Sequence, residues 1–188
     1  MVRLRTYALL FVVGGVGIAA LDLMHVAAGT TSYSDPTAFG QPWWVIPQMG
    51  LATILATVAG RAFVRREVAR PRELPVRIML FAGAYGVTAV LWRNSLLLLG
   101  LLLAAWAITL VVSAEGRPTV LYCVLFAAIG TGYEMALVAV GIFSYAEPEV
   151  LGVQVWLPGL YLIAGLLGIT LGRTFPARII ERAPARSS

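Results

Sequence analysis

The sequence contains no lysine, one cysteine and one histidine, and each scarcity excludes a class of site. A single cysteine cannot form an intramolecular disulfide, and Cys123 lies in an apolar run, which favours a core position over redox or metal chemistry. Because His25 is the only histidine, a histidine-rich metal site is excluded. No nucleotide-binding loop or metalloprotease helix is present either. The sequence therefore predicts no metal ion, no cofactor and no catalytic residue.

Charged residues are also scarce. They make up 12% of the chain, against 60% hydrophobic residues and a mean hydropathy of +0.86. A soluble domain carries about 25% charged residues, so this composition indicates a protein that crosses a membrane several times. The net charge of +5 comes from arginines that flank apolar runs, and we therefore expect contact with lipid headgroups and not with nucleic acid.

The apolar runs predict an all-α, polytopic membrane protein with one domain over residues 1–188, folded as a bundle of six transmembrane helices. The expected spans cover residues 7–26, 43–60, 78–91, 95–112, 119–143 and 153–172. The first is too long for the core of a cleaved signal peptide, so we expect a retained signal anchor. No internal repeat is apparent, which disfavours a secondary transporter.

Arginine counting predicts the orientation. With the N-terminus in the cytoplasm, 13 of the 14 basic residues fall on cytoplasmic segments and only Arg93 faces outward. Both termini are then cytoplasmic, and the tail from Thr174 to Ser188 lies on the membrane surface or is disordered. The expected location is the cell membrane of a bacterium, or the endoplasmic reticulum if the source is eukaryotic.

Polar residues inside the spans are the candidates for function, because each is costly in hydrocarbon. Asp22 and His25 share a helix face, and Glu134 follows Thr131 with the same spacing. Counting about 1.5 Å per residue, Asp22 and Glu134 lie about 22 Å from the cytoplasmic edge, and Gln48 reaches the same level from outside. This polar layer either holds the head of a lipid or bonds the helices to one another.

Aromatic and small residues complete the candidates. We expect Trp43, Trp44, Trp92 and Trp156 in the outer aromatic belt, with cavity lining as their second role. Gly168 and Gly172 favour close helix packing within the chain over an oligomer face. The predicted lipid-binding residues are Asp22, His25, Trp44, Gln48, Tyr85, Tyr133, Glu134 and Met135.

Two blocks of sequence resemble a known family. The run GIFSYAEPEVLGVQVWLPG from Gly141, continuing to GITLGR, resembles the penultimate loop and last transmembrane helix of the Insig (insulin-induced gene) proteins. The run QPWWVIP from Gln41 is similar to the signature that opens the second helix of that family. The middle of the chain matches in hydrophobic pattern alone.

The resemblance implies a six-helix protein that binds an amphipathic lipid in a cavity among its helices. Insig proteins bind oxysterol and hold the Scap–SREBP complex in a lipid-dependent way. An aspartate that the family needs for Scap falls at about Trp92 here, and the glutamine expected near the sterol falls at about Met135. Lipid binding therefore transfers better than sterol specificity or the eukaryotic partners.

These observations together predict a non-enzymatic, lipid-binding or lipid-sensing membrane protein. The lipid is sterol-like or a glycerolipid such as diacylglycerol, the protein client is unknown, and a homo-oligomer is among the expected assemblies. The alternative is a lipid-modifying enzyme or a small lipid transporter that uses Asp22, His25 and Glu134 as acid and base.

Overall fold

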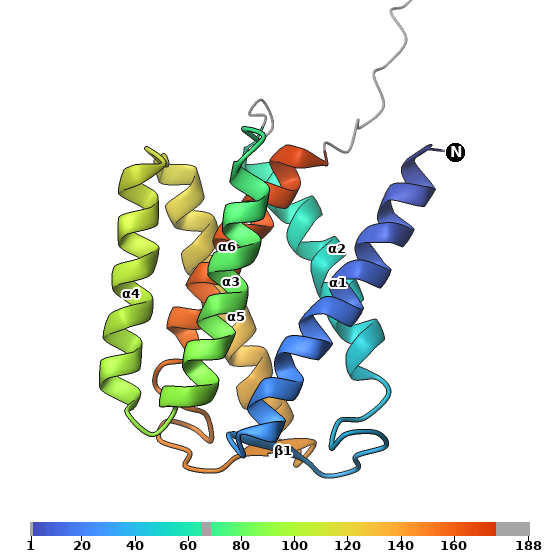
Figure 1. The fold of residues 1–188 in the computed structure, drawn as a ribbon, viewed down its shortest axis with the longest axis vertical. Helices are drawn as coiled ribbons and strands as arrows, with labels where there is room; N and C mark the ends of the chain where they lie inside the picture. The colour runs from blue at the N-terminus through green and yellow to red at the C-terminus, as the bar shows by residue number, and fades with distance from the viewer. Residues whose placement is uncertain (1, 65–68, 176–188) are drawn as a thin grey trace, which may run out of the picture.

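The computed structural model describes residues 2–64 and 69–175, and six long helices dominate them (Figure 1). Each is long and apolar enough to cross a membrane, which confirms the expected polytopic bundle. Residues 65–68 of the arginine-rich connection and most of the expected tail, residues 176–188, lie outside the described residues. The helices are α1 (Val2–Ala27), α2 (Val45–Phe63), α3 (Glu73–Leu91), α4 (Ser95–Val112), α5 (Arg117–Ala139) and α6 (Leu157–Thr174).

The helix ends on either side of the last connection differ from the expected spans. The fifth span was expected to reach residue 143, but α5 ends at Ala139 because Gly141 adopts a φ of +73°, a left-handed conformation that stops a helix. The sixth span was expected from residue 153, but Val153 pairs with Val150 in a β-bridge and α6 begins only at Leu157. Both differences lengthen the polar connection between these two helices.

Helix α6 forms the centre of the bundle. In α6, 72% of the membrane-length window is buried, against at most 33% in any other helix of the described residues. Its glycines permit this, since a Cβ on Gly172 would lie 2.4 Å from the backbone nitrogen of Arg61 in α2. A Cβ on Gly60 would likewise lie 2.5 Å from the carbonyl oxygen of Gly168. Gly168 and Gly172 thus pack within the chain, as expected.

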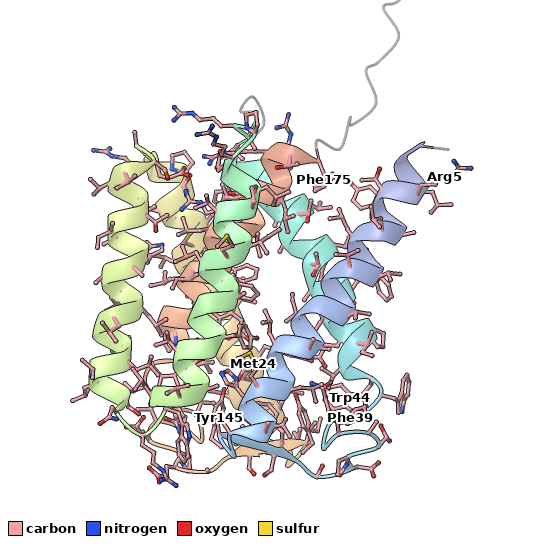
Figure 2. All side chains as sticks on the ribbon, viewed as in Figure 1. Arg5, Met24, Phe39, Trp44, Tyr145 and Phe175 are labelled. Atoms are coloured by element: carbon pink, nitrogen blue, oxygen red, sulfur yellow. The ribbon has the colours of Figure 1, made fainter. Side chains whose placement is uncertain are left out.

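The two ends of the bundle differ in chemistry. One end, here called the arginine-rich end, carries the start of α1, the end of α6 and the turn between α4 and α5. The other end carries two short strands, β1 (Thr31–Tyr33) and β2 (Phe143–Tyr145), which pair antiparallel although they are far apart in the sequence. We call this strand pair the β1–β2 hairpin and this end the hairpin end. Figure 2 shows Arg5 and Phe175 at the first end and Phe39 and Tyr145 at the second. That the arginine-rich end faces the cytoplasm remains a prediction.

A buried ion network closes the arginine-rich end. The third span was expected from residue 78, but α3 begins at Glu73 because both charged residues of its first turns have partners. Arg77, whose side chain is 2% exposed, donates to Glu115 at 3.0 Å. Arg173 of α6 donates to Glu115 at 2.7 Å and to Glu73 at 2.9 Å. The network joins α3, the turn before α5 and the end of α6.

The expectation that the chain has no internal repeat is wrong. The unit α1–β1–α2 recurs as α5–β2–α6, and the paired residues Ser32 and Ser144 give the offset of 112 residues. At this offset residues 32–36 (SYSDP) match residues 144–148 (SYAEP), and residues 60–63 (GRAF) match residues 172–175 (GRTF). The backbones agree as well: Trp44 and Trp156 precede α2 and α6 with φ values of −72° and −76°.

The two units are related by an approximate two-fold axis. In the hairpin, Ser32 pairs with its own equivalent Ser144, and their hydroxyl oxygens lie 3.0 Å apart. At the arginine-rich end, α2 and α6 cross where the equivalent residues Gly60 and Gly172 meet. The α3–α4 hairpin has no second copy in the described residues, and both of its helices contact α6. This one-sided insertion explains why α6 is buried and its equivalent α2 is not.

Candidate functional site

Two carboxylates lie at equivalent positions of the repeat, directly beneath the β1–β2 hairpin. Asp22 of α1 accepts hydrogen bonds from the Tyr33 hydroxyl of β1 and from Gln41 Nε2, each at 2.7 Å. Glu134 of α5, 112 residues later, accepts hydrogen bonds from the Tyr145 hydroxyl of β2 and, at 2.6 Å, from the Tyr161 hydroxyl. Each carboxylate thus ties the last turns of a span to its own strand of the hairpin.

The two carboxylates and their hydrogen-bond donors are here called the polar cluster, and His25 extends this cluster toward α3. Its Nε2 lies 2.7 Å from the Thr88 hydroxyl, and its ring stacks on Tyr85 with centroids 4.9 Å apart. The indole of Trp156 lies on another side of the ring at 5.7 Å. In residues 2–64 and 69–175 no hydrogen bond joins His25 to either carboxylate, so the three residues do not form an acid–base relay.

Three polar groups of the cluster have no partner within the described chain. The Tyr85 hydroxyl makes no hydrogen bond, although the residue is only 9% exposed. The Thr131 hydroxyl, one turn before Glu134, is buried without a partner, and so is Gln154 Nε2. Buried polar groups are hydrogen-bonded in the great majority of cases, so unsatisfied ones indicate water or a ligand that completes them.

The surroundings of the cluster are strongly apolar and carry no opposing charge. Burial raises the pKa of Tyr33, and the neighbouring charge of Asp22, then that of Glu134, raises it further. Burial raises the pKa of Tyr145 as well, and the charge of Glu134 raises it further. Neither carboxylate forms a salt bridge among the described residues; the arginine of this end, Arg93, is exposed and lies 3.6 Å from Glu147. The cluster is therefore an acceptor-rich site enclosed by aromatic rings.

An apolar groove runs beside the cluster on the outer face between α1 and α3. Its volume is about 510 Å³, and its lining residues are Met24, Gly83, Gly86, Val87, Val90 and Leu91. A Cβ on Gly83 would meet nothing within 4 Å, so the groove owes part of its width to missing side chains. Two lining residues are sequence neighbours of the cluster, since Met24 precedes His25 and Gly86 follows Tyr85, and Figure 2 shows Met24 on the lower part of α1.

The structure brings several of the predicted residues together. Asp22, His25, Tyr85 and Glu134 belong to the cluster, and Trp44 lies next to it, with its ring 5.8 Å from that of Tyr33. Met135 is half-buried and packs against the core around the cluster.

Other predicted residues lie elsewhere. Gln48 is half-buried but makes no hydrogen bond to the cluster in the described residues. Tyr133 is 46% exposed because it lies on the outward face of α5. Trp156 was expected in the outer aromatic belt, which is wrong: it is fully buried and donates to Gln154 Oε1 at 3.0 Å. The same expectation is wrong for Trp92, which is 8% exposed because it belongs to the hydrophobic core and the Arg93 guanidinium lies over its ring at 4.7 Å.

Sequence reasoning missed the partners of the carboxylates. Gln41, Tyr33 and Tyr145 lie in the connections, where polar residues are ordinary, and Tyr161 lies within an apolar span. The repeat would have found two of them, because Tyr33 follows Asp22 by 11 residues and Tyr145 follows Glu134 by the same 11. A pattern that recurs at a constant offset was the available signal.

Comparison with known proteins extends the resemblance over nearly the whole chain. No protein-family model matches it. The chain is 30% identical over 189 residues to an INSIG protein homologue of Mycolicibacterium vanbaalenii, which covers 97% of this chain and 92% of that protein. It is 26% identical to insulin-induced gene 1 protein of Gallus gallus (92% and 73% covered) and 25% identical to that of Homo sapiens (95% and 68%).

Solved structures agree with the sequence comparison. The crystal structure of a mycobacterial Insig homologue from Mycobacterium vanbaalenii matches with a TM-score of 0.79 and 29% identity, covering 92% of this chain and 94% of that one. A cross-linked trimer of the same homologue matches with a TM-score of 0.78 and 28% identity, covering 91% and 94%. The resemblance drawn from two sequence blocks is thus confirmed: the chain belongs to the Insig (insulin-induced gene) family of integral, multi-pass membrane proteins.

Proposed function

We propose that this protein binds one amphipathic lipid, with the polar head in the Asp22–Glu134 cluster and an apolar part in the groove between α1 and α3. Membership of the Insig family supports a sterol- or lipid-sensing role in the membrane in general. In this proposal the lipid is released unchanged, so the protein acts as a sensor and not as an enzyme.

The unpartnered Tyr85 hydroxyl carries the proposal. Two carboxylates bonded to tyrosines could by themselves be helix glue, since each already has two donors. Tyr85 is different, because its hydroxyl bonds to nothing in the described chain although the residue is only 9% exposed, and its neighbour Gly86 lines the groove. A ligand atom that accepts from this hydroxyl would gain one net hydrogen bond, worth about 1 kcal/mol.

The site favours a lipid whose head both donates and accepts hydrogen bonds. The carboxylate oxygens of Asp22 and Glu134 accept, whereas the hydroxyls of Tyr85 and Thr131 donate. A single hydroxyl satisfies both requirements, and sterols and diacylglycerols each present one. The apolar lining of the groove suits a ring system or an acyl chain equally well.

The test compares Tyr85→Phe with the wild type by native mass spectrometry and lipid extraction of the detergent-purified protein. The substitution removes only the hydroxyl that has no protein partner, so the fold loses no hydrogen bond. We expect a co-purified lipid of one class, bound about five- to tenfold more weakly by the variant, since one net hydrogen bond is worth about 1 kcal/mol. Equal lipid occupancy in both proteins would contradict the proposal.

Tyr122→Phe is the matched control. The Tyr122 hydroxyl donates to the carbonyl oxygen of Ala56 at 2.9 Å, far from the cluster, and bonds α5 to α2. This variant should lower the melting temperature without changing lipid occupancy. Tyr85→Phe should instead lower lipid occupancy, and after removal of the lipid its melting temperature should equal that of the wild type.

A second candidate, a small lipid transporter, gains one observation from the structure. Parallel repeats related by an axis along the membrane normal occur in transporters, and α1–β1–α2 and α5–β2–α6 are such units. Reconstitution in liposomes with a fluorescent lipid in one leaflet separates the two functions, because a transporter speeds the movement of this lipid between leaflets and a sensor does not.

The native mass spectra proposed for the lipid also report the oligomeric state. They show whether this chain assembles as the trimer of its relative does, and whether an unidentified client protein co-purifies.

A further inference from the structure

The two loops at the hairpin end each contain a tight, exposed turn, and both turns place a large apolar residue directly before a glycine. The first turn, residues 38–41 (AFGQ), is closed by a bridge between Ala38 and Gln41, and the second, residues 150–153 (VLGV), by a bridge between Val150 and Val153. We call these the loop tips. They are equivalent at the offset of 112 residues.

Both central residues of each loop tip have a left-handed backbone. Phe39 and Gly40 adopt φ values of +54° and +82°, and Leu151 and Gly152 adopt +48° and +85°. A two-residue turn with two positive φ values has the type I′ form, which strongly favours asparagine, aspartate or glycine at its first position. Phenylalanine and leucine are among the least suited residues there, because their Cβ atoms crowd the backbone.

Folding of the loops therefore does not account for these two side chains. Phe39 is 89% exposed and Leu151 is 80% exposed, so neither contributes to a core. Both units nevertheless place a large apolar side chain at this position, directly before the shared glycine of the turn. The two exposed side chains therefore indicate that the loop tips contact an apolar partner.

The position of the loop tips identifies that surface. A Cβ on Gly40 would lie 2.8 Å from Val26 in the last turn of α1, and a Cβ on Gly152 would lie 2.6 Å from Val138 in the last turn of α5. Each tip therefore sits level with the end of a membrane-spanning helix, where hydrocarbon gives way to headgroups. Trp43, which is 70% exposed, occupies the same region, and Figure 2 shows Phe39 at the periphery of this end.

We propose that the two loop tips are a pair of interfacial anchors, which insert Phe39 and Leu151 into the boundary between headgroups and acyl chains of the leaflet at the hairpin end. The partner is thus the lipid surface itself. Asp35 and Glu147, at equivalent positions of the same loops, stay in water. The anchors hold the β1–β2 hairpin at a fixed height above the polar cluster, and this inference does not depend on which lipid the cluster binds.

Site-directed spin labelling in bilayers tests the proposal. After Cys123→Ala, single labels are placed by Phe39→Cys and Leu151→Cys, with Asp35→Cys and Glu147→Cys as matched controls from the same loops. At residues 39 and 151 we expect access to oxygen to exceed access to a water-soluble nickel reagent, as at the edge of the hydrocarbon. The control positions should show the opposite ratio. An aqueous ratio at residues 39 and 151, or exclusion of both reagents by a second copy of the chain, would overturn the proposal.

A second experiment separates anchoring from folding. Because asparagine suits a type I′ turn, the double variant Phe39→Asn, Leu151→Asn should melt in detergent at the wild-type temperature or above it. In lipid nanodiscs the same variant should melt below the wild type, because its anchors are gone. Asp35→Asn should change neither temperature. A parallel rise in detergent and in nanodiscs would show that the apolar side chains have no membrane role.

Discussion

Neutralising Glu115 should destabilise the protein more than removal of any exposed charge. Its two carboxylate oxygens serve two arginines, since Arg77 and Arg173 donate to them at 3.0 and 2.7 Å. The side chain of Glu115 is only 4% exposed, so water cannot replace it as an acceptor. Glu115→Gln keeps the size of the side chain but leaves two buried guanidinium groups with a neutral partner.

The expected loss follows from the burial of the network. Breaking a buried ion pair by removing one partner costs about 3–5 kcal/mol, because the remaining charge stays buried. Arg173 keeps Glu73 as a second partner at 2.9 Å, which places the loss for Glu115→Gln toward the lower value of that range. Glu147→Gln is the control, since the Arg93–Glu147 pair is 73% and 60% exposed and such pairs contribute about 0–1 kcal/mol.

The loss should also depend on pH. Burial by itself would raise the pKa of Glu115, but hydrogen bonding to Arg173 and the charges of Arg173 and Arg77 outweigh it and hold that pKa below its usual value. A lowered carboxyl pKa stabilises the fold fully above the unfolded value of about 4.3, and this contribution disappears as the pH falls through the folded value. Because protonated glutamate resembles glutamine, the difference between the two proteins should shrink below about pH 4.

Reversible unfolding in mixed detergent micelles, followed by tryptophan fluorescence at pH 7 and below pH 4, measures both effects. A loss below about 1 kcal/mol at pH 7 would refute the idea that the network holds α3, α5 and α6 together. A loss of the expected size that stays constant with pH would refute the account of the Glu115 pKa.

Two further predictions address the repeat. Gly172→Ala should destabilise the bundle by at least about 2 kcal/mol, because its Cβ would meet the backbone of Arg61. Gly132→Ala is the control and should be neutral or slightly stabilising, because a Cβ there meets nothing within 4 Å. Thermal melts in detergent compare the two variants, and equal effects would argue against the α2–α6 crossing. Ser32→Cys with Ser144→Cys should form an intramolecular disulfide under mild oxidation, because these residues face each other in the hairpin with hydroxyl oxygens 3.0 Å apart. A cross-link between chains, or none, on a gel would contradict the pairing of β1 with β2.

Hydropathy and arginine placement were sufficient to predict the six helices, because a chain in hydrocarbon must satisfy its backbone within helices. The helix ends were harder. Glu73 and Arg77 look like residues of a polar connection, and only their partners Glu115 and Arg173, distant in sequence, allow them to lie within α3. The hairpin was missed for a related reason, since its strands have three residues each and pair across 112 positions.

The candidate site was predicted in part. Intramembrane charge identified Asp22 and Glu134, and helix rise placed them at one level, as the repeat requires. Helix rise says nothing about direction around the helix axis, so Tyr133 was grouped with Glu134 although it is 46% exposed. Gln48 was predicted as a member of the site because it lies in a span, yet it is Gln41 whose side chain reaches from the connection to Asp22.

The repeat separates the structural part of the cluster from the part that is free to bind. Both units keep a carboxylate that accepts from a tyrosine 11 residues later, and this shared pair attaches each strand of the hairpin to its helix. What the units do not share is His25, whose equivalent is Leu137, and Tyr85, which belongs to the unrepeated helix α3. These unshared residues stack on each other beside the groove, and one of them carries the unpartnered hydroxyl. The conserved geometry of the two units is therefore sufficient to hold the hairpin, and the asymmetry introduced by α3 is what turns one side of the cluster into a candidate lipid site.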